Sequence, residues 1–227
     1  MPESKAVIWD MDGVIAYTAP YHLRAWQEVF QKRGLTFTEQ EFQRHFGQRN
    51  DTIIKSALGE EISQQEIDAI ASEKENSFRR RIKQNIKPLP GVIELMTSLR
   101  QHGFNMALAS SAPTENIQLI TQTLGINDCF HSIVTGHEVA EGKPSPQIFL
   151  RAAKKLGVKP ENCIVIEDSL AGVAAAKRAR MYCLAVTNTH PRSSLSEADL
   201  IVDSLETVSV ADVENLLRQR SLTWKGL

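Results

Sequence analysis

The chain has 227 residues, enough to bury a substantial core, and its composition of 42% apolar and 23% charged residues is typical of globular proteins. A formal net charge of −1 gives no basic footprint for nucleic acid and no polybasic membrane patch, and no apolar stretch reaches the roughly 18 residues of a membrane span. The N-terminus leads straight into an apolar strand without a signal-peptide pattern. The three cysteines are far apart and odd in number, which indicates buried thiols and a cytoplasmic protein.

Residues 5–10 form a short apolar run that predicts a buried strand, and two acids and a glycine follow it. From about residue 20 to 86 the pattern is almost entirely helical. Apolar pairs at helical spacing predict a first helix that Gly34 ends. Shorter helices are expected at 39–45 and 50–58. A longer helix is expected to begin near Ser63, where Ser-Gln-Gln-Glu matches a capping box, and to end in a cationic run that suits the negative end of the helix dipole.

The prolines at positions 88 and 90 cannot continue a helix, so residues 87–91 mark a boundary. Beyond it helical and strand patterns alternate. Helices are expected at 91–102, 114–124, 145–156, 170–179 and 210–220, and strands at 105–109, 132–135, 163–166, 182–186 and 200–202. The alternation predicts an α/β fold with a doubly wound, Rossmann-like parallel sheet. We therefore expect a core of residues 1–16 and 88–227 with an all-helical domain, residues 17–87, inserted after the first strand.

Polar clusters occur where strands of this core should end, and the carboxyl ends of parallel strands meet at one edge of the sheet. The clusters are, in chain order, Asp10 with Asp12, Ser110 with Ser111, Lys143, and Glu167 with Asp168. Each has a structural alternative: the acids and serines form turns or cap helices, and a single lysine is usually solvated. As an ordered set they fit phosphoryl transfer, in which a carboxylate can act as a nucleophile and cations surround the phosphoryl group.

These residues resemble the four ordered motifs of the haloacid dehalogenase-like superfamily. The helical insertion, the Gly-Lys-Pro-Ser-Pro segment at 142–146 and the Ile-Glu-Asp-Ser-Leu-Ala-Gly segment at 166–172 are similar to the β-phosphoglucomutase-like phosphatase branch, whose helices form a cap. The resemblance covers nearly the whole chain. It departs from the mutase pattern at Tyr17, in a specificity loop that is one residue shorter, and at 112–113 after the motif serines.

The resemblance implies a role for each core residue. Asp10 would be the nucleophile and would become phosphorylated, and Asp12 would be the general acid and base. Phosphate would be bound by Ser110, Ser111 and Lys143. Mg²⁺ would be the cofactor, held by Asp10, Asp12 through its backbone carbonyl, Glu167 and Asp168.

Substrate choice would lie with the cap. Residues 47–52 resemble the family's specificity loop, in which Arg49 could hold a second anionic group because a guanidinium suits phosphate. The alternative is that Arg49 is solvated and that Asn50 only caps the next helix. Lys74 falls where a cap lysine often points into the site. His22 lies on the apolar stripe of the first cap helix, where it either lines the cleft or is simply buried.

The sequence therefore predicts a cytoplasmic, Mg²⁺-dependent phosphatase whose substrate is a small phosphorylated metabolite such as a sugar phosphate. The enzyme is expected to be a monomer, without a nucleic-acid or membrane partner. β-Phosphoglucomutase activity on the same scaffold is the main alternative. An Asp-x-Asp glycosyltransferase is disfavoured because no nucleotide-binding stretch is present. A non-catalytic binding protein on this fold is disfavoured because every core motif position is filled.

Overall fold

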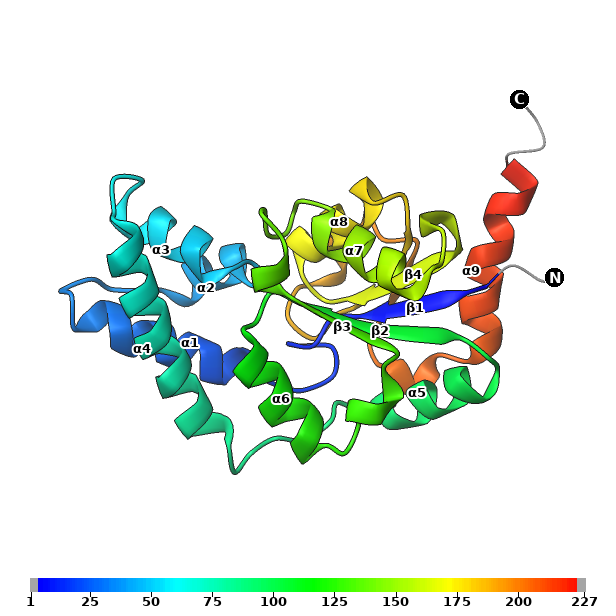
Figure 1. Ribbon diagram of the computed structural model, residues 1–227, viewed down its shortest axis with the longest axis horizontal. Helices are drawn as coiled ribbons and strands as arrows, with labels where there is room; N and C mark the ends of the chain where they lie inside the picture. Colours follow the sequence, from blue (N-terminus) through cyan, green and yellow to red (C-terminus); the bar gives the residue numbers. More distant parts are fainter. Residues whose placement is uncertain (1–3, 224–227) are drawn as a thin grey trace.

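A parallel sheet of six strands lies at the centre of the computed structural model, which describes residues 4–223 (Figure 1). The strands are β1 (Ala6–Trp9), β2 (Asn105–Ser110), β3 (Ser132–Thr135), β4 (Cys163–Glu167), β5 (Tyr182–Val186) and β6 (Leu200–Val202). Their order across the sheet is β3-β2-β1-β4-β5-β6. The chain order reverses direction beside β1, and ligands bind at the carboxyl ends of the strands at such a switch point. The predicted α/β fold is confirmed.

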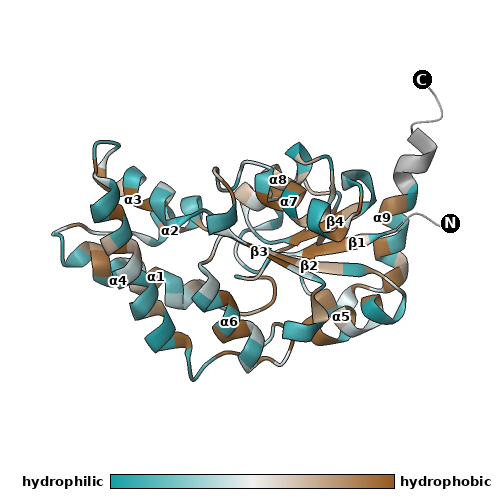
Figure 2. Ribbon diagram, viewed as in Figure 1, coloured by the Kyte–Doolittle hydropathy of each residue, from teal (hydrophilic) through white to brown (hydrophobic). Residues whose placement is uncertain are grey.

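Helices cover both faces of the sheet, so the core has three layers. One face carries α5 (Val92–Gln101), α6 (Thr114–Thr123) and α9 (Val210–Thr223), and the other carries α7 (Gln147–Leu156) and α8 (Leu170–Arg178). Alternate residues of β1 point to opposite faces: Val7 and Trp9 join the first cluster, and Ala6 and Ile8 the second. Because both faces are buried, the strands are apolar except at their ends, while the outer faces of the helices are polar (Figure 2).

Four helices form an insertion between β1 and α5. They are α1 (Ala19–Gln31), α2 (Glu39–His45), α3 (Asn50–Leu58) and α4 (Gln64–Ile82). A hydrophobic cluster that includes Trp26, Phe30 and Ile54 holds them together, apart from the two clusters on the sheet. The chain enters and leaves the insertion side by side, since Leu89 N–H donates to the Ile15 carbonyl at 2.9 Å.

The predicted helices and strands all occur, with ends that differ by two residues or fewer except at the two terminal helices. The helix expected from 145 begins at Gln147. Pro144 and Pro146 disfavour helical backbone at the residues before them, which delays the start. The expected capping box at Ser63 is present, with reciprocal bonds between Ser63 and Glu66. Over residues 4–223, no helix combines the length and the apolar character needed to cross a bilayer.

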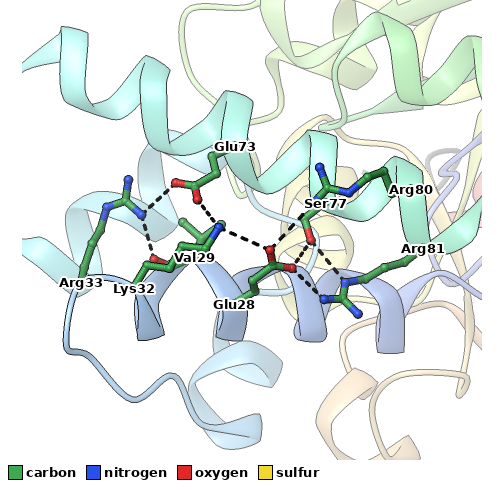
Figure 3. Close-up of polar contacts among 8 residues, drawn as sticks. All are labelled: Glu28, Val29, Lys32, Arg33, Glu73, Ser77, Arg80 and Arg81. Atoms are coloured by element: carbon green, nitrogen blue, oxygen red, sulfur yellow. Dashed lines mark hydrogen bonds and ion pairs between the residues drawn. The ribbon is translucent and has the colours of Figure 1, made fainter.

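An ion-pair network joins α1 to α4 on the outer side of the insertion, as Figure 3 shows. Glu28 accepts hydrogen bonds from Ser77 Oγ at 2.5 Å and from Arg81 at 2.7 Å. Lys32 donates to Glu28 at 3.4 Å and to Glu73 at 2.7 Å, so it connects the two acids. Glu28 therefore lies at the centre of the polar contacts between α1 and α4.

The Ser77 hydroxyl and the Arg81 guanidinium lower the pKa of Glu28 to about 2. The stabilisation from this carboxylate is therefore complete above its ordinary pKa of 4.5 and is lost as the pH falls toward 2. We expect Glu28→Gln to lower the free energy of unfolding at pH 7 by about 1 kcal/mol, since the site is partly solvated. Urea unfolding should show this difference in free energy shrinking below pH 4.5. The control is Glu94→Gln, at an exposed position of α5, which should unfold like the wild type.

Candidate active site

The ends of β1 and β4 place the first pair of acids in a confined position. Asp10 directly follows β1, and its N–H donates to the Ile166 carbonyl at 3.0 Å, which fixes it beside β4. Gly13 then turns the chain with a φ of +81°. A Cβ at this position would lie 1.8 Å from Asp168 Oδ2, so only glycine allows the turn to pass so close to the second pair of acids.

Lys143 lies between two carboxylates. Its Nζ donates to Asp10 Oδ1 and to Glu167 Oε1, each at 2.5 Å, and its side chain is 0% exposed. Burial alone would lower the pKa of this ammonium, but the charges of Asp10 and Glu167 outweigh it and hold the pKa above its usual value. The ammonium is therefore a permanent positive charge beside Asp10.

Three acids, Asp10, Glu167 and Asp168, offer carboxylate oxygens within 4.8 Å of one another. Burial is the main cause that raises the pKa of Asp10 to about 7, and the negative charges of the neighbouring acids add to it. The same causes raise the pKa of Asp168 well above the usual range. Asp168 Oδ2 accepts a hydrogen bond from Thr189, but Oδ1 is buried with no hydrogen-bond partner. Crowded carboxylates with an unsatisfied oxygen form a donor set that suits a hard divalent cation.

Asp12 faces the helical insertion instead of this cluster. Its Oδ1 lies 3.0 Å from His22 Nε2, and His22 Nδ1 lies 2.9 Å from Lys74 Nζ. Because Lys74 can only donate, Nδ1 accepts and Nε2 carries the proton toward Asp12. Burial would raise the pKa of Asp12, yet the contacts with His22 and Lys74 lower it below the usual value. The pKa values of the two acids of the first motif are thus shifted in opposite directions by their surroundings.

A cavity of about 40 Å³ lies between these acids and the insertion. The core contributes Asp10, Asp12, Ser110, Ser111 and Ala112, and the insertion contributes His22, Trp26, Phe42, Phe46, Gly47, Gln48, Asn50, Ile53, Lys74 and Glu75. The structure therefore brings most of the predicted residues of both parts to one cavity. Ser110 is buried at the end of β2, and Ser111 Oγ donates to the Gly47 carbonyl at 2.8 Å, which ties the insertion to the core.

Arg49 lies outside this lining. Its guanidinium pairs with Asp51 at 2.8 Å and donates to the Val139 carbonyl at 2.9 Å. Its side-chain carbons also cover Gly142, where a Cβ would lie 2.7 Å from Arg49 Cδ. The structure thus places Arg49 against the loop that leads to Lys143, whereas the predicted cap residues Asn50, Lys74 and His22 do line the cavity.

Several residues of the site escape sequence reasoning. Thr189 and His190 follow β5, and His190 contacts the carbonyls of Asp168 at 3.1 Å and of Gln43, in α2, at 2.9 Å. The polar run after this strand is the same signal that marks the other strand ends. Glu75 gives no such signal, because it follows Lys74 in a helix rich in charged residues.

Comparisons with known proteins agree with this geometry. The family model described as haloacid dehalogenase-like hydrolase matches residues 4–180. β-Phosphoglucomutase of Bacillus subtilis is 35% identical over 206 residues, which are 87% of this chain and 88% of that protein. Fructose-1-phosphate phosphatase YqaB of Escherichia coli is 32% identical over 178 residues, 77% of this chain and 92% of that protein. Protein SUPPRESSOR OF QUENCHING 1, chloroplastic, of Arabidopsis thaliana is 34% identical over 218 residues, 92% of this chain but only 20% of that protein.

Among solved structures, β-phosphoglucomutase from Clostridium difficile superimposes with a TM-score of 0.87 at 29% identity. The match covers 96% of this chain and 99% of that one. Both the sheet and the helical insertion are therefore shared. The chain belongs to the haloacid dehalogenase-like hydrolases, in their β-phosphoglucomutase-like branch, and is an enzyme of phosphoryl chemistry.

Proposed function

We propose that this enzyme is a Mg²⁺-dependent phosphatase that hydrolyses a small phosphorylated metabolite through an aspartyl-phosphate on Asp10. The observation that carries the proposal is the position of Asp10. Its carboxylate lines the cavity beside the ammonium of Lys143, with the hydroxyl of Ser110 nearby and Asp12 held separately by His22. This arrangement offers a nucleophile, cations for the phosphoryl group and a second carboxyl for proton transfer.

In the first step an oxygen of Asp10 would attack phosphorus, and the bond from phosphorus to the ester oxygen would break. Asp12 would take up a proton as the phosphoester binds and would then give it to that oxygen, so that the leaving group departs as an alcohol. Asp12 would then take a proton from water as the water oxygen attacks phosphorus, which releases inorganic phosphate and restores the Asp10 carboxylate. Lys143, Ser110 and Ser111 would donate hydrogen bonds to the phosphoryl oxygens in both steps.

The acidic cluster fits a bound Mg²⁺. Asp10, Glu167 and Asp168, with the backbone carbonyl of Asp12, would hold it, and the orphaned Asp168 Oδ1 is the atom that most needs a cation. When bound, the ion would supply positive charge that offsets the repulsion between these carboxylates and an incoming phosphate.

We further propose that residues 17–87 act as a cap domain over a catalytic core of residues 1–16 and 88–227. The aromatic residues of the insertion would exclude bulk water from the bound phosphoester. The substrate would be a small phosphorylated metabolite and the enzyme a cytoplasmic monomer, with no nucleic acid or membrane as partner, in keeping with a net charge of −1.

β-Phosphoglucomutase activity is a second candidate, which the 35% identity to the Bacillus subtilis enzyme favours. A mutase would pass the phosphoryl group from Asp10 to a second hydroxyl of the sugar instead of to water. It would also need a sugar bisphosphate to enter the cavity.

A panel of phosphorylated metabolites separates these candidates. We expect phosphate release from one class of sugar monophosphate, with activity lost in EDTA and restored by added Mg²⁺. The panel should include both anomers of glucose 1-phosphate, with a catalytic amount of glucose 1,6-bisphosphate, and should also follow glucose 6-phosphate. Formation of glucose 6-phosphate without free phosphate would establish the mutase, and no metal-dependent turnover of any compound would reject both candidates.

A further inference from the structure

Glu75 places a carboxylate in the wall of the cavity, on the side of the insertion. It lies on α4, is 5% exposed and lines the cavity together with the core serines. Its Oε1 accepts hydrogen bonds from Asn50 at 2.8 Å and from Lys74 at 2.7 Å, and its Oε2 accepts one from Asn116 of α6 at 2.6 Å. The Asn116 side-chain carbonyl is itself held by Arg79 at 2.9 Å. The carboxylate is therefore built into the wall from both the insertion and the core.

This carboxylate keeps its negative charge. Burial would raise the pKa of Glu75, but the charge of Lys74 and the hydrogen bonds from Lys74 and Asn116 lower it to about 2. The pair of Lys74 and Glu75 is then neutral as a whole, so the ammonium is not free to bind an anion. Arg49, the other cation expected near the cavity, is bound to Asp51 and to the Val139 carbonyl outside the lining.

The rest of the wall on this side suits an uncharged group. Trp26, Phe42 and Phe46 supply apolar surface, and Gln48 and Asn50 supply amides that can bind hydroxyls. A second phosphate placed here would meet the buried carboxylate of Glu75, while Lys74 is already paired with it, and juxtaposed like charges in a buried site are strongly unfavourable.

We propose that Glu75 restricts this enzyme to monophosphate esters of small, uncharged, hydroxyl-bearing alcohols and excludes bisphosphates. The inference rests on the proposed phosphatase function and adds the substrate class. It also argues against the mutase, because transfer of the phosphoryl group to a sugar monophosphate must form a bisphosphate in this cavity. Replacing Glu75 by glutamine keeps the size of the side chain and an oxygen for Asn116, but it frees Lys74 to bind an anion.

The test compares a sugar monophosphate that the panel shows to be hydrolysed with the bisphosphate of the same sugar, such as fructose 1-phosphate with fructose 1,6-bisphosphate. We expect the wild type to prefer the monophosphate in kcat/KM by about 100-fold. Glu75→Gln should reduce this preference at least tenfold, mainly through a lower KM for the bisphosphate. Glu73→Gln is the matched control, because Glu73 lies on the same helix but pairs with Lys32 and Arg33 outside the cavity.

A wild type that hydrolyses both compounds equally well would overturn the inference, and this result does not depend on the folding of any variant. An unchanged preference in Glu75→Gln with a native circular dichroism spectrum would also overturn it. In either case the proposed phosphatase function would stand. That function fails separately, if no monophosphate in the panel releases phosphate with Mg²⁺.

Discussion

Replacing Asp10 with asparagine should abolish turnover and leave the fold intact. An amide cannot attack phosphorus to form the acyl phosphate, and loss of a nucleophile lowers kcat by roughly 10⁴-fold or more. The fold should persist, because asparagine has the same shape and its backbone N–H still donates to the Ile166 carbonyl. The substitution also removes a buried carboxylate whose pKa burial, helped by the charges of Glu167 and Asp12, raises to about 7.

The measurement is phosphate release at saturating substrate, together with thermal unfolding followed by circular dichroism. Asp128→Asn is a matched control, since Asp128 is exposed in the short turn Asn127–Cys129 that follows α6, and the variant should retain full activity and stability. Mass spectrometry of quenched wild type should show one added phosphoryl group, which the Asp10→Asn variant should lack. Turnover by Asp10→Asn near the wild-type rate would refute the covalent mechanism.

Replacing Lys143 with methionine should remove activity and destabilise the protein. Methionine preserves the length of the side chain but leaves Asp10 and Glu167 buried without their shared cation. Breaking a buried ion pair by removing one partner costs about 3 to 5 kcal/mol. The loss should be smaller at acidic pH, because the pKa of Asp10 is already raised and a folded state that binds protons more tightly gains stability as the pH falls.

Urea unfolding of Lys143→Met at pH 5 and pH 8 measures both effects. We expect the deficit in unfolding free energy relative to wild type to be larger at pH 8. Lys154→Met, on the exposed side of α7, should match the wild type at both values. A Lys143→Met protein as stable as wild type at pH 8 would show that the ammonium does not hold these carboxylates together.

The order of motifs along the chain allowed the core of the site to be predicted. Asp10, Ser110 and Glu167 each end or follow an apolar run, and a parallel sheet brings such positions to one edge. Thr189 was within reach of the same reasoning, because it follows β5 in the same way and donates to Asp168.

The side of the cavity formed by the insertion could not be predicted equally well. Whether a charged residue of α4 faces the cavity depends on how four helices pack, and α4 carries charges on most of its surface. Glu75 and Glu73 are two residues apart in the sequence, yet one lines the cavity and the other forms exposed ion pairs. A motif predicted that Arg49 belongs to the specificity loop. Its observed position depends on Asp51 and on a carbonyl ninety residues away in the chain.

The position of β1 has a consequence for how the protein is made. Of the six strands this one is synthesised first, but it lies in the middle of the sheet, where Ala6 is in register with Asn105 on one side and with Cys163 on the other. At a synthesis rate of roughly 5 to 20 residues per second, its apolar residues remain unpaired for several seconds or longer before β2 and β4 are synthesised. The helical insertion has its own hydrophobic cluster and is complete in the meantime. We therefore expect a nascent chain in which folded helices precede the sheet, with β1 unpaired until β2 and then β4 have emerged.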